Sequence, residues 1–247
     1  MTSIGRFCLI VSMLVPGAAS CGPPFTTDDP GIVETGHVEL LGFHQSTLAE
    51  HERSGVLAGM ESHFGIVKNV ELDLVTPLAF SHPDGGAMRR GYGDTTLGLK
   101  YQLQEEAADR PLVSVVPRVN FATGDAGRGL GNGASQIFVG VAAQKRFGEY
   151  TGYGSAGYWV NHGAGNRDYA FAGVVMQRDL GSHWTLGVEV FANGSTASDR
   201  PASLGFNAGG YYRLDEHDQV LFSAGRGLVH ASDTNRASAY VGYQHAF

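Results

Sequence analysis

Residues 184–190 read Trp-Thr-Leu-Gly-Val-Glu-Val, with an apolar side chain at every second position. The positions between them hold threonine, glycine and Glu189. Side chains alternate between the two faces of a β-strand, so one face of this segment is apolar and the other is polar or small. A helix does not produce a period of two. The stretch therefore predicts a strand whose apolar face meets a nonpolar medium while Glu189 faces away from it.

The same alternation recurs along most of the chain. Residues 96–103, 113–121 and 203–213 repeat it clearly, and about twelve segments of roughly ten residues share it. An even number of such segments is what a closed bacterial barrel needs. We therefore predict an all-β fold, a transmembrane antiparallel up-and-down β-barrel of about 12 strands over residues 36–247. The segments begin near Gly36, Gly55, Asn69, Gly93, Pro111, Ala134, Thr151, Asp168, His183, Ala202, Gln219 and Arg236.

The connections between these segments fall into two kinds that alternate along the chain. In outer-membrane barrels the periplasmic turns are short and the outer loops are long. Residues 104–110 form a longer exception among the short connections. The short set is 66–68, 148–149, 180–182 and 215–218, and the long set is 81–90, 123–133, 162–167 and 193–201.

Composition narrows the class of partner. The 247 residues include 36 Gly, 13 Phe and 10 Tyr, and only 17% are charged. Abundant glycine and aromatic residues suit many strands joined by tight turns. The net charge is −7 and no basic stripe is present to neutralise phosphates, which argues against a nucleic-acid partner.

Both ends of the chain indicate export to an outer membrane. Residues 1–20 resemble a signal peptide, with Arg6, a short apolar run and a small-residue cleavage zone. Residues 21–35 form a Pro-rich N-terminal arm that suits an extended conformation. Cys21 allows either lipidation or an ordinary cut near the same position. The last segment ends in Phe247, as expected of a strand recognised by barrel-assembly machinery, so we place the protein in outer-membrane lipid of a Gram-negative bacterium.

Two motifs carry a resemblance to a known family. Residues 24–30 read Pro-Phe-Thr-Thr-Asp-Asp-Pro and are followed by Gly-His-Val-Glu at 36–39. Residues 91–101, Gly-Tyr-Gly-Asp-Thr-Thr-Leu-Gly-Leu-Lys-Tyr, form the second motif. Together they resemble the outer-membrane family associated with the meta-pathway of phenol degradation. The resemblance implies a barrel that transports aromatic or other apolar small molecules.

Charged residues occupy strand positions whose side chains are expected to face the lumen. Acidic and basic groups on opposed walls would set a field across the lumen and orient a solute. Alternatively, these groups pair and close a narrow barrel, and the arm enters the lumen with Asp28 and Asp29 against Lys100 or Arg118. The candidate lumen-lining residues are Glu39, Glu61, Glu71, Asp73, Lys100, Arg118 and Glu189.

Catalytic and cofactor sites receive little support. His44 and Ser46 share the outward face of one strand, as a lipid hydrolase would require, but they lack the surrounding motif of such enzymes. Residues 152–157 match GxGxxG, yet a strand continues after them where a dinucleotide site needs a helix. The sequence has no HExxH and no paired cysteines, so it predicts no metal site. We expect no catalytic residues and no cofactor.

The positions of the aromatic residues indicate a structural role in the membrane more than a role in ligand binding. Those near strand ends suit the headgroup level of a membrane, whereas Phe43, Phe138 or Tyr211 could stack on a ligand. The favoured function is passage or binding of small apolar or aromatic molecules. A closed structural or adhesion-type barrel and, less favoured, a lipid hydrolase are the alternatives. The residues assigned to the headgroup level are Tyr150, Trp159, Trp184, Tyr212, Tyr243 and Phe247.

Overall fold

The computed structural model describes residues 24–247, and the segment assigned to the signal peptide and Cys21 lies outside them. Strands make up almost all of the regular structure in this range. The exceptions are a 3-10 turn at Ala126–Arg128 and a short helix, α1, at Ala231–Thr234. No helix among the described residues is long and apolar enough to cross a membrane.

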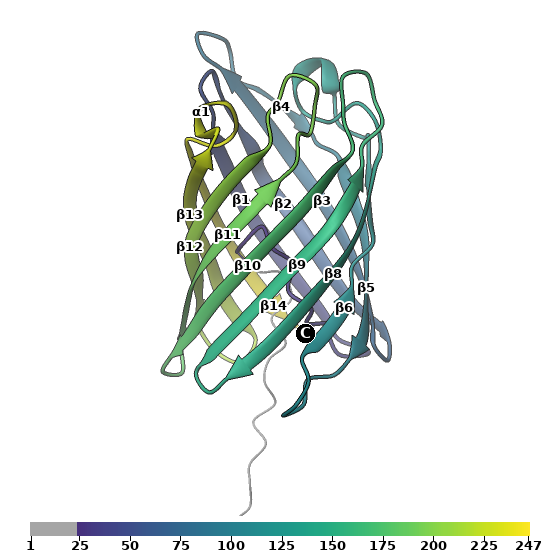
Figure 1. Cartoon of the computed structure of the whole chain (residues 1–247), viewed down its shortest axis with the longest axis vertical. Coiled ribbons are helices and arrows are strands. Elements are labelled where there is room, and N and C mark those ends of the chain that lie inside the picture. The colour runs from purple at the N-terminus through teal and green to yellow at the C-terminus, as the bar shows by residue number, and fades with distance from the viewer. Residues whose placement is uncertain (1–23) are drawn as a thin grey trace, which may run out of the picture.

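The strands form one sheet of fourteen hydrogen-bonded members (Figure 1). Each of the twelve predicted starting points lies within three residues of a strand start. The strands are β1 (Val38–Leu48), β2 (Glu52–Val67), β3 (Val70–Pro83), β4 (Arg89–Tyr92), β5 (Thr95–Gln104), β6 (Leu112–Val115), β7 (Arg118–Phe121), β8 (Gln136–Phe147), β9 (Tyr150–Val160), β10 (Tyr169–Leu180), β11 (Trp184–Asn193), β12 (Ser203–Arg213), β13 (Asp218–Val229) and β14 (Ala237–Ala246).

The fourteen strands build a closed barrel of twelve wall segments. β4 and β5 both pair with β3 and so form one segment, and β6 and β7, which both pair with β5 and β8, form another. The interruption between β6 and β7 contains Pro117, which has no N–H to donate to a ladder. β1 pairs with β14 along its length, so the sheet closes without a free edge. The predicted 12-strand antiparallel barrel is confirmed.

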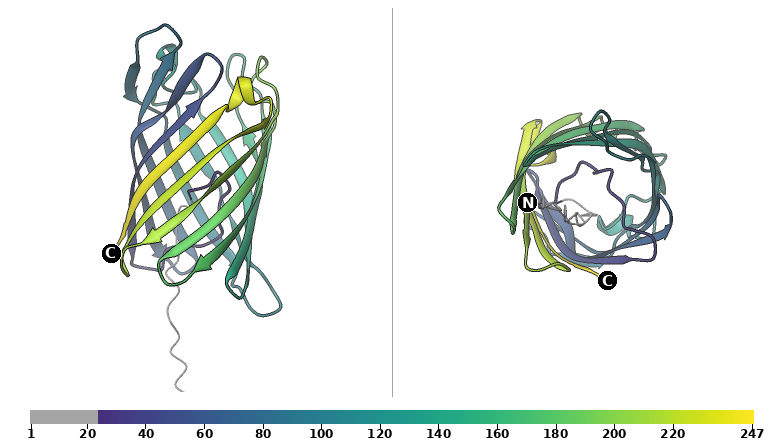
Figure 2. Two further views of the ribbon diagram at one scale, coloured as in Figure 1. Left: turned by 90° about the vertical axis from the view of Figure 1, so that its left-hand side faces the viewer. Right: turned by 90° about the horizontal axis from the view of Figure 1, so that it is seen from below.

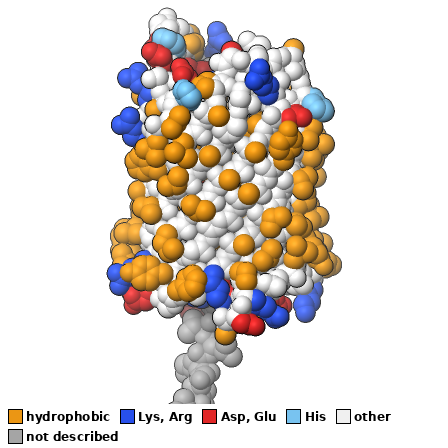
Figure 3. Space-filling view, in the orientation of Figure 1, with side chains coloured by type: hydrophobic (Ala, Val, Ile, Leu, Met, Phe, Trp, Pro, Cys, Tyr) orange, Lys and Arg blue, Asp and Glu red, His pale blue; other side chains and the backbone are white. Residues whose placement is uncertain are grey.

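Alternation along the strands separates a lipid-facing wall from the lumen. On β10 Val174 and Met176 are exposed, whereas Val175 between them is buried. Figure 3 shows hydrophobic side chains over the middle of the wall and charged ones gathered at its two ends. A band of this kind matches the nonpolar interior of a bilayer.

The two ends of the barrel differ. The long connections and α1 lie at one end, and the short turns lie at the other, together with the C-terminus (Figures 1 and 2). By the rule for such barrels, the end with long loops faces outward and the end with short turns faces the periplasm. Viewed from below in Figure 2, the N-terminal arm, coloured purple, lies inside the ring of strands.

Candidate functional site

The N-terminal arm crosses the lumen and bonds to walls that are distant in sequence. Ser223 Oγ on β13 donates to the carbonyl of Pro24 at 2.5 Å, and Ser114 Oγ on β6 donates to the carbonyl of Pro30 at 2.6 Å. Proline lacks an N–H group, so its carbonyl is the backbone group that needs a partner here. These bonds hold the arm in an extended path across the barrel.

Glu189 on β11 anchors the middle of the arm. Its carboxylate accepts hydrogen bonds from Thr27 N and Thr27 Oγ1, both at 2.6 Å, and from Thr26 N at 3.1 Å. Asn207 Nδ2 on β12 donates to the same carboxylate at 2.5 Å. Glu189 is only 1% exposed, so these donors replace the water that a carboxylate would otherwise bind.

Arg118 on β7 holds the next residue of the arm. Its Nη1 and Nη2 lie 2.7 Å and 3.1 Å from the two carboxylate oxygens of Asp28. The guanidinium also lies 4.3 Å from the Phe138 ring centroid and 5.3 Å from that of Trp159. The prediction that Trp159 lies at the headgroup level is therefore wrong, because its ring points into the lumen and flanks this ion pair.

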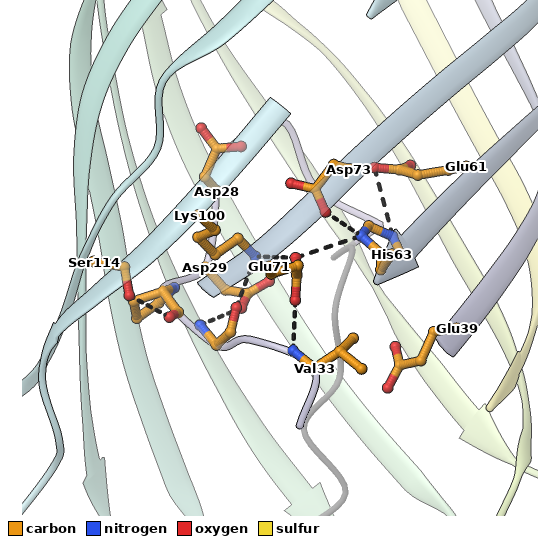
Figure 4. Close-up of polar contacts among 12 residues, drawn as sticks. Asp28, Asp29, Val33, Glu39, Glu61, His63, Glu71, Asp73, Lys100 and Ser114 are labelled. Atoms are coloured by element: carbon orange, nitrogen blue, oxygen red, sulfur yellow. Dashed lines mark hydrogen bonds and ion pairs between the residues drawn. The ribbon is translucent and has the colours of Figure 1, made fainter. Parts of the chain in front are cut away.

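A second group of contacts ties the end of the arm to β3 and β5. Lys100 Nζ lies 3.4 Å from Glu71 Oε1 and donates to the carbonyl of Gly31 at 2.7 Å. Glu71 Oε2 in turn accepts from Val33 N at 2.5 Å. Figure 4 shows these bonds beside His63 and Asp73, which come from the neighbouring strands β2 and β3.

Acidic and basic groups do not stand on opposed walls as one hypothesis expected. Glu71 and Lys100 are direct cross-strand partners in the β3–β5 ladder, so their charges are adjacent. Cross-strand partners have β-carbons only about 4.5–5.5 Å apart, which brings opposite charges into contact. Lys100 pairs with Glu71, and Arg118 pairs with Asp28 of the arm, as the alternative hypothesis proposed for these basic groups.

Asp29 is the most deeply enclosed acid of the arm. Its Oδ1 accepts from Gly31 N at 2.8 Å, and the residue is only 7% exposed. Burial raises the pKa of this carboxyl above its ordinary value, while the nearby positive charge of Lys100 acts in the opposite direction.

A cavity of about 460 Å³ lies between the arm and the outer loops. Pro24, Phe25 and Thr26 of the arm line it, and Asn235 from the outer connection also contributes. A volume of this size suits a small organic molecule. Its aromatic lining consists of Phe25, Phe43, Phe191 and Tyr240, and its acidic lining consists of Asp28 and Glu61.

The seven predicted lumen residues are placed as follows. Glu71, Lys100, Arg118 and Glu189 contact the arm. Glu61 and Asp73 line lumen cavities, and Glu39 accepts a hydrogen bond from Gln244. Sequence reasoning missed His63, although its position two residues after Glu61 gives it the same inward phase. It also missed the uncharged side chains that hold the arm, namely Thr27, Ser114, Ser155, Asn207 and Ser223.

The residues considered for catalysis have other partners. His44 Nδ1 lies 3.1 Å from the carbonyl of Leu57, and Ser46 Oγ accepts from Arg53 Nε at 2.8 Å. The GxGxxG stretch at 152–157 lies within β9, so its backbone belongs to a ladder and does not open a helix.

These features define an outer-membrane β-barrel whose N-terminal arm occupies its own lumen. Residues 51–242 match the family described as "Putative MetA-pathway of phenol degradation", and the chain belongs to this family. No curated protein sequence matches it.

Solved structures share the fold at low sequence identity. The chain is similar to the COG4313 outer membrane channel from Pseudomonas putida F1, with a TM-score of 0.74 and 14% identity over 89% of this chain and 98% of that one. It is also similar to the NanC porin, with a TM-score of 0.57 and 7% identity over 84% of this chain and 98% of the porin.

Proposed function

We propose that the protein is an outer-membrane channel for small aromatic or other apolar molecules, and that its N-terminal arm closes the lumen below their binding cavity. The observation that carries this proposal is the cavity of about 460 Å³, whose floor is the arm itself and whose largely polar lining includes four aromatic rings. A solute that enters from the outer loops reaches this cavity first and meets the arm before it can pass further.

The cavity chemistry supports a small aromatic solute. Phe43 and Tyr240 stack with ring centroids 5.7 Å apart, so an apolar face is already assembled at the wall. A favourable contact between two aromatic rings contributes about 0.5–1.5 kcal/mol of binding free energy, in addition to the contribution from the buried apolar area. The chain belongs to a family whose description refers to phenol degradation, and phenol is a small aromatic molecule of this kind.

Passage in this proposal involves no chemistry by the protein. Its support is that His44 and Ser46 each bond to a different group, which leaves the pair without the nucleophile–base contact that hydrolysis requires. Insertion by barrel-assembly machinery, guided by the strand that ends near Phe247, is part of the same proposal.

Single-channel conductance of the purified protein in planar bilayers tests the closure. A matched variant replaces residues 24–31 with a Gly/Ser segment of equal length, so the chain length is kept while the side-chain contacts are lost. We expect low conductance for the wild type and a steady, larger conductance for the variant. Equal conductance of the two proteins would mean that the arm does not close the lumen.

Binding of a small neutral arene such as 1-naphthol, measured by calorimetry, tests the solute. We expect saturable binding by the wild type. A protein that binds no arene and conducts in neither form would instead be a closed structural barrel, whose outer loops do the work.

A further inference from the structure

His63 on β2 presents an unused nitrogen inside the lumen wall. The residue is only 2% exposed, and its Nδ1 lies 2.8 Å from Asp73 Oδ1. When Asp73 is ionised, a ring nitrogen at this distance carries a proton and donates it to the carboxylate. The other nitrogen, Nε2, is buried and has no hydrogen-bond partner among the described residues. Glu61 Oε1 lies 3.7 Å from this nitrogen, which is too long for a hydrogen bond.

This arrangement matches the way proteins prepare a histidine to bind a metal. A ligating imidazole usually donates its second N–H to a carboxylate, which fixes the ring and raises the basicity of the ligating nitrogen. Asp73 takes that role because it is the direct cross-strand partner of His63 in the β2–β3 ladder. Tetrahedral Zn²⁺, with bonds of about 2.0–2.1 Å, holds neighbouring ligand atoms about 3.4 Å apart. The separation of 3.7 Å between His63 Nε2 and Glu61 Oε1 is close to that span.

Space and charge beside His63 favour a cation. A cavity of about 100 Å³ is lined by His63, Glu61 and Asp73 and also by Asp28 and Asp29 of the arm. It leaves room for water to complete the coordination of an ion. An ion bound there would lie between the barrel wall and the arm.

The same region holds more acidic than basic groups. Arg118 is engaged by Asp28, which leaves the ammonium of Lys100 as the cation facing the remaining acids. Buried carboxylates in proteins are paired or coordinate metals; Glu71 is fully buried, and the side chains of Asp73 and Glu61 are 18% and 26% exposed. Even with Asp29 protonated and His63 neutral, the carboxylates outnumber that ammonium. They are Glu61, Glu71 and Asp73.

We propose that His63 and Glu61, supported by Asp73, form a binding site for a divalent transition-metal ion of the Zn²⁺ class. His63 Nε2 and a Glu61 oxygen are the protein ligands, and Asp73 positions the imidazole through Nδ1–H. Imidazole and carboxylate together suit Zn²⁺ better than the hard cations that prefer oxygen alone.

Zn²⁺ titration of the full-length, detergent-purified protein, in competition with a chromophoric chelator, tests the site. His63→Gln removes the ligating nitrogen, and His51→Gln changes an exposed histidine of the outer β1–β2 turn as the matched control. We expect wild type and His51→Gln to bind one equivalent of Zn²⁺ more than His63→Gln. Asp73→Asn should weaken that equivalent about 10-fold to 100-fold, as loss of a supporting carboxylate does.

A second probe separates coordination from general adhesion of metal to the protein. Co²⁺ bound by nitrogen and oxygen ligands gives a visible absorption band, which should be present in wild type and absent in His63→Gln. Heat-modifiable migration in detergent gels verifies that each variant is a folded barrel. Equal Zn²⁺ stoichiometry and affinity in folded wild type and folded His63→Gln would overturn the proposal and leave a protonated imidazole as the occupant of this position.

Discussion

Asp28 and Arg118 form a two-pronged ion pair inside the barrel, with nitrogen–oxygen distances of 2.7 Å and 3.1 Å. Both side chains are partly open to the lumen, at 21% and 25% exposure, so solvent weakens the pair relative to a fully buried one. The contact nonetheless joins the arm directly to the wall segment that is interrupted at Pro117. It is therefore a point at which the closed state can be weakened without disturbing the barrel ladder.

Arg118→Gln should favour release of the arm. A hydrogen bond to a charged group contributes about 1.5–3 kcal/mol, and the lower part of that range applies here because of the exposure. About 1.4 kcal/mol corresponds to a tenfold change in an equilibrium, so we expect roughly a tenfold larger open fraction in single-channel records. Arg178→Gln is the control, because Arg178 pairs with Glu149 at 2.9 Å on the exposed periplasmic side. An open fraction that rises equally in both variants would contradict a specific role for Arg118.

Asp29 makes the stability of the folded protein depend on pH. Its pKa is raised in the folded protein by burial, so the folded state retains this proton over a pH range in which the unfolded state has lost it. The contribution of Asp29 to stability is therefore greatest below the unfolded pKa of about 3.9 and decreases as pH rises through the folded pKa. Asp29→Asn imitates the protonated form and should stabilise the protein more at pH 7 than at pH 4.

Urea unfolding in detergent micelles at the two pH values measures this difference. Asp109→Asn, in the exposed periplasmic connection between β5 and β6, serves as the control and should change stability equally at both pH values. If Asp29→Asn behaves like the control, the buried carboxyl of Asp29 does not contribute to the pH dependence.

The barrel could be predicted from sequence because alternation is a local property that repeats in every wall segment. Residues 113–121 show where the pattern is insufficient, since alternation continues across Pro117 while the ladder is interrupted into β6 and β7. Trp159 and Tyr153 are separated by an even number of positions in β9, so their side chains lie on the same face of the strand. Tyr153 is buried in the lumen, and the alternation of the sequence could have placed Trp159 on that inward face as well.

The contacts of the site could not be predicted in the same way. The alternation along a strand shows which side chains face inward. The partner of each residue depends on the register between neighbouring strands. Glu71 meets Lys100 because the β3–β5 ladder aligns them across a connection that contains β4. The bond from Ser223 to Pro24 joins residues 199 positions apart, and no local pattern encodes that distance.

Phe43 should contribute to binding of an aromatic solute. Its ring is stacked on Tyr240 at the wall of the outer cavity, so Phe43→Ala removes one face of the apolar lining. A loss of about 0.5–1.5 kcal/mol would weaken binding of 1-naphthol by about 2-fold to 10-fold in calorimetry. Phe147→Ala is the control, because that side chain is 61% exposed near the periplasmic end of β8. Unchanged affinity in Phe43→Ala would place the solute elsewhere.

Gly173 on β10 gives the most direct steric test of the arm. A β-carbon at this position would lie 1.9 Å from Thr27 Oγ1 and 3.3 Å from the β-carbon of Phe191. Thr27 is fully buried and donates to Glu189 at 2.6 Å, so the arm has no room to yield while it keeps that bond. The lipid-facing side of β10 is unaffected by the added methyl group.

Gly173→Ala should therefore displace the arm while the barrel remains folded, and single-channel conductance should rise toward that of the arm-replacement variant. Gly42→Ala is the matched control, because a β-carbon there meets nothing within 4 Å. Adding Thr27→Gly to Gly173→Ala removes the clashing side chain and should restore part of the closure, since Thr27 N can still donate to Glu189. Wild-type conductance in folded Gly173→Ala would show that the close approach of Thr27 to β10 is not needed to close the channel.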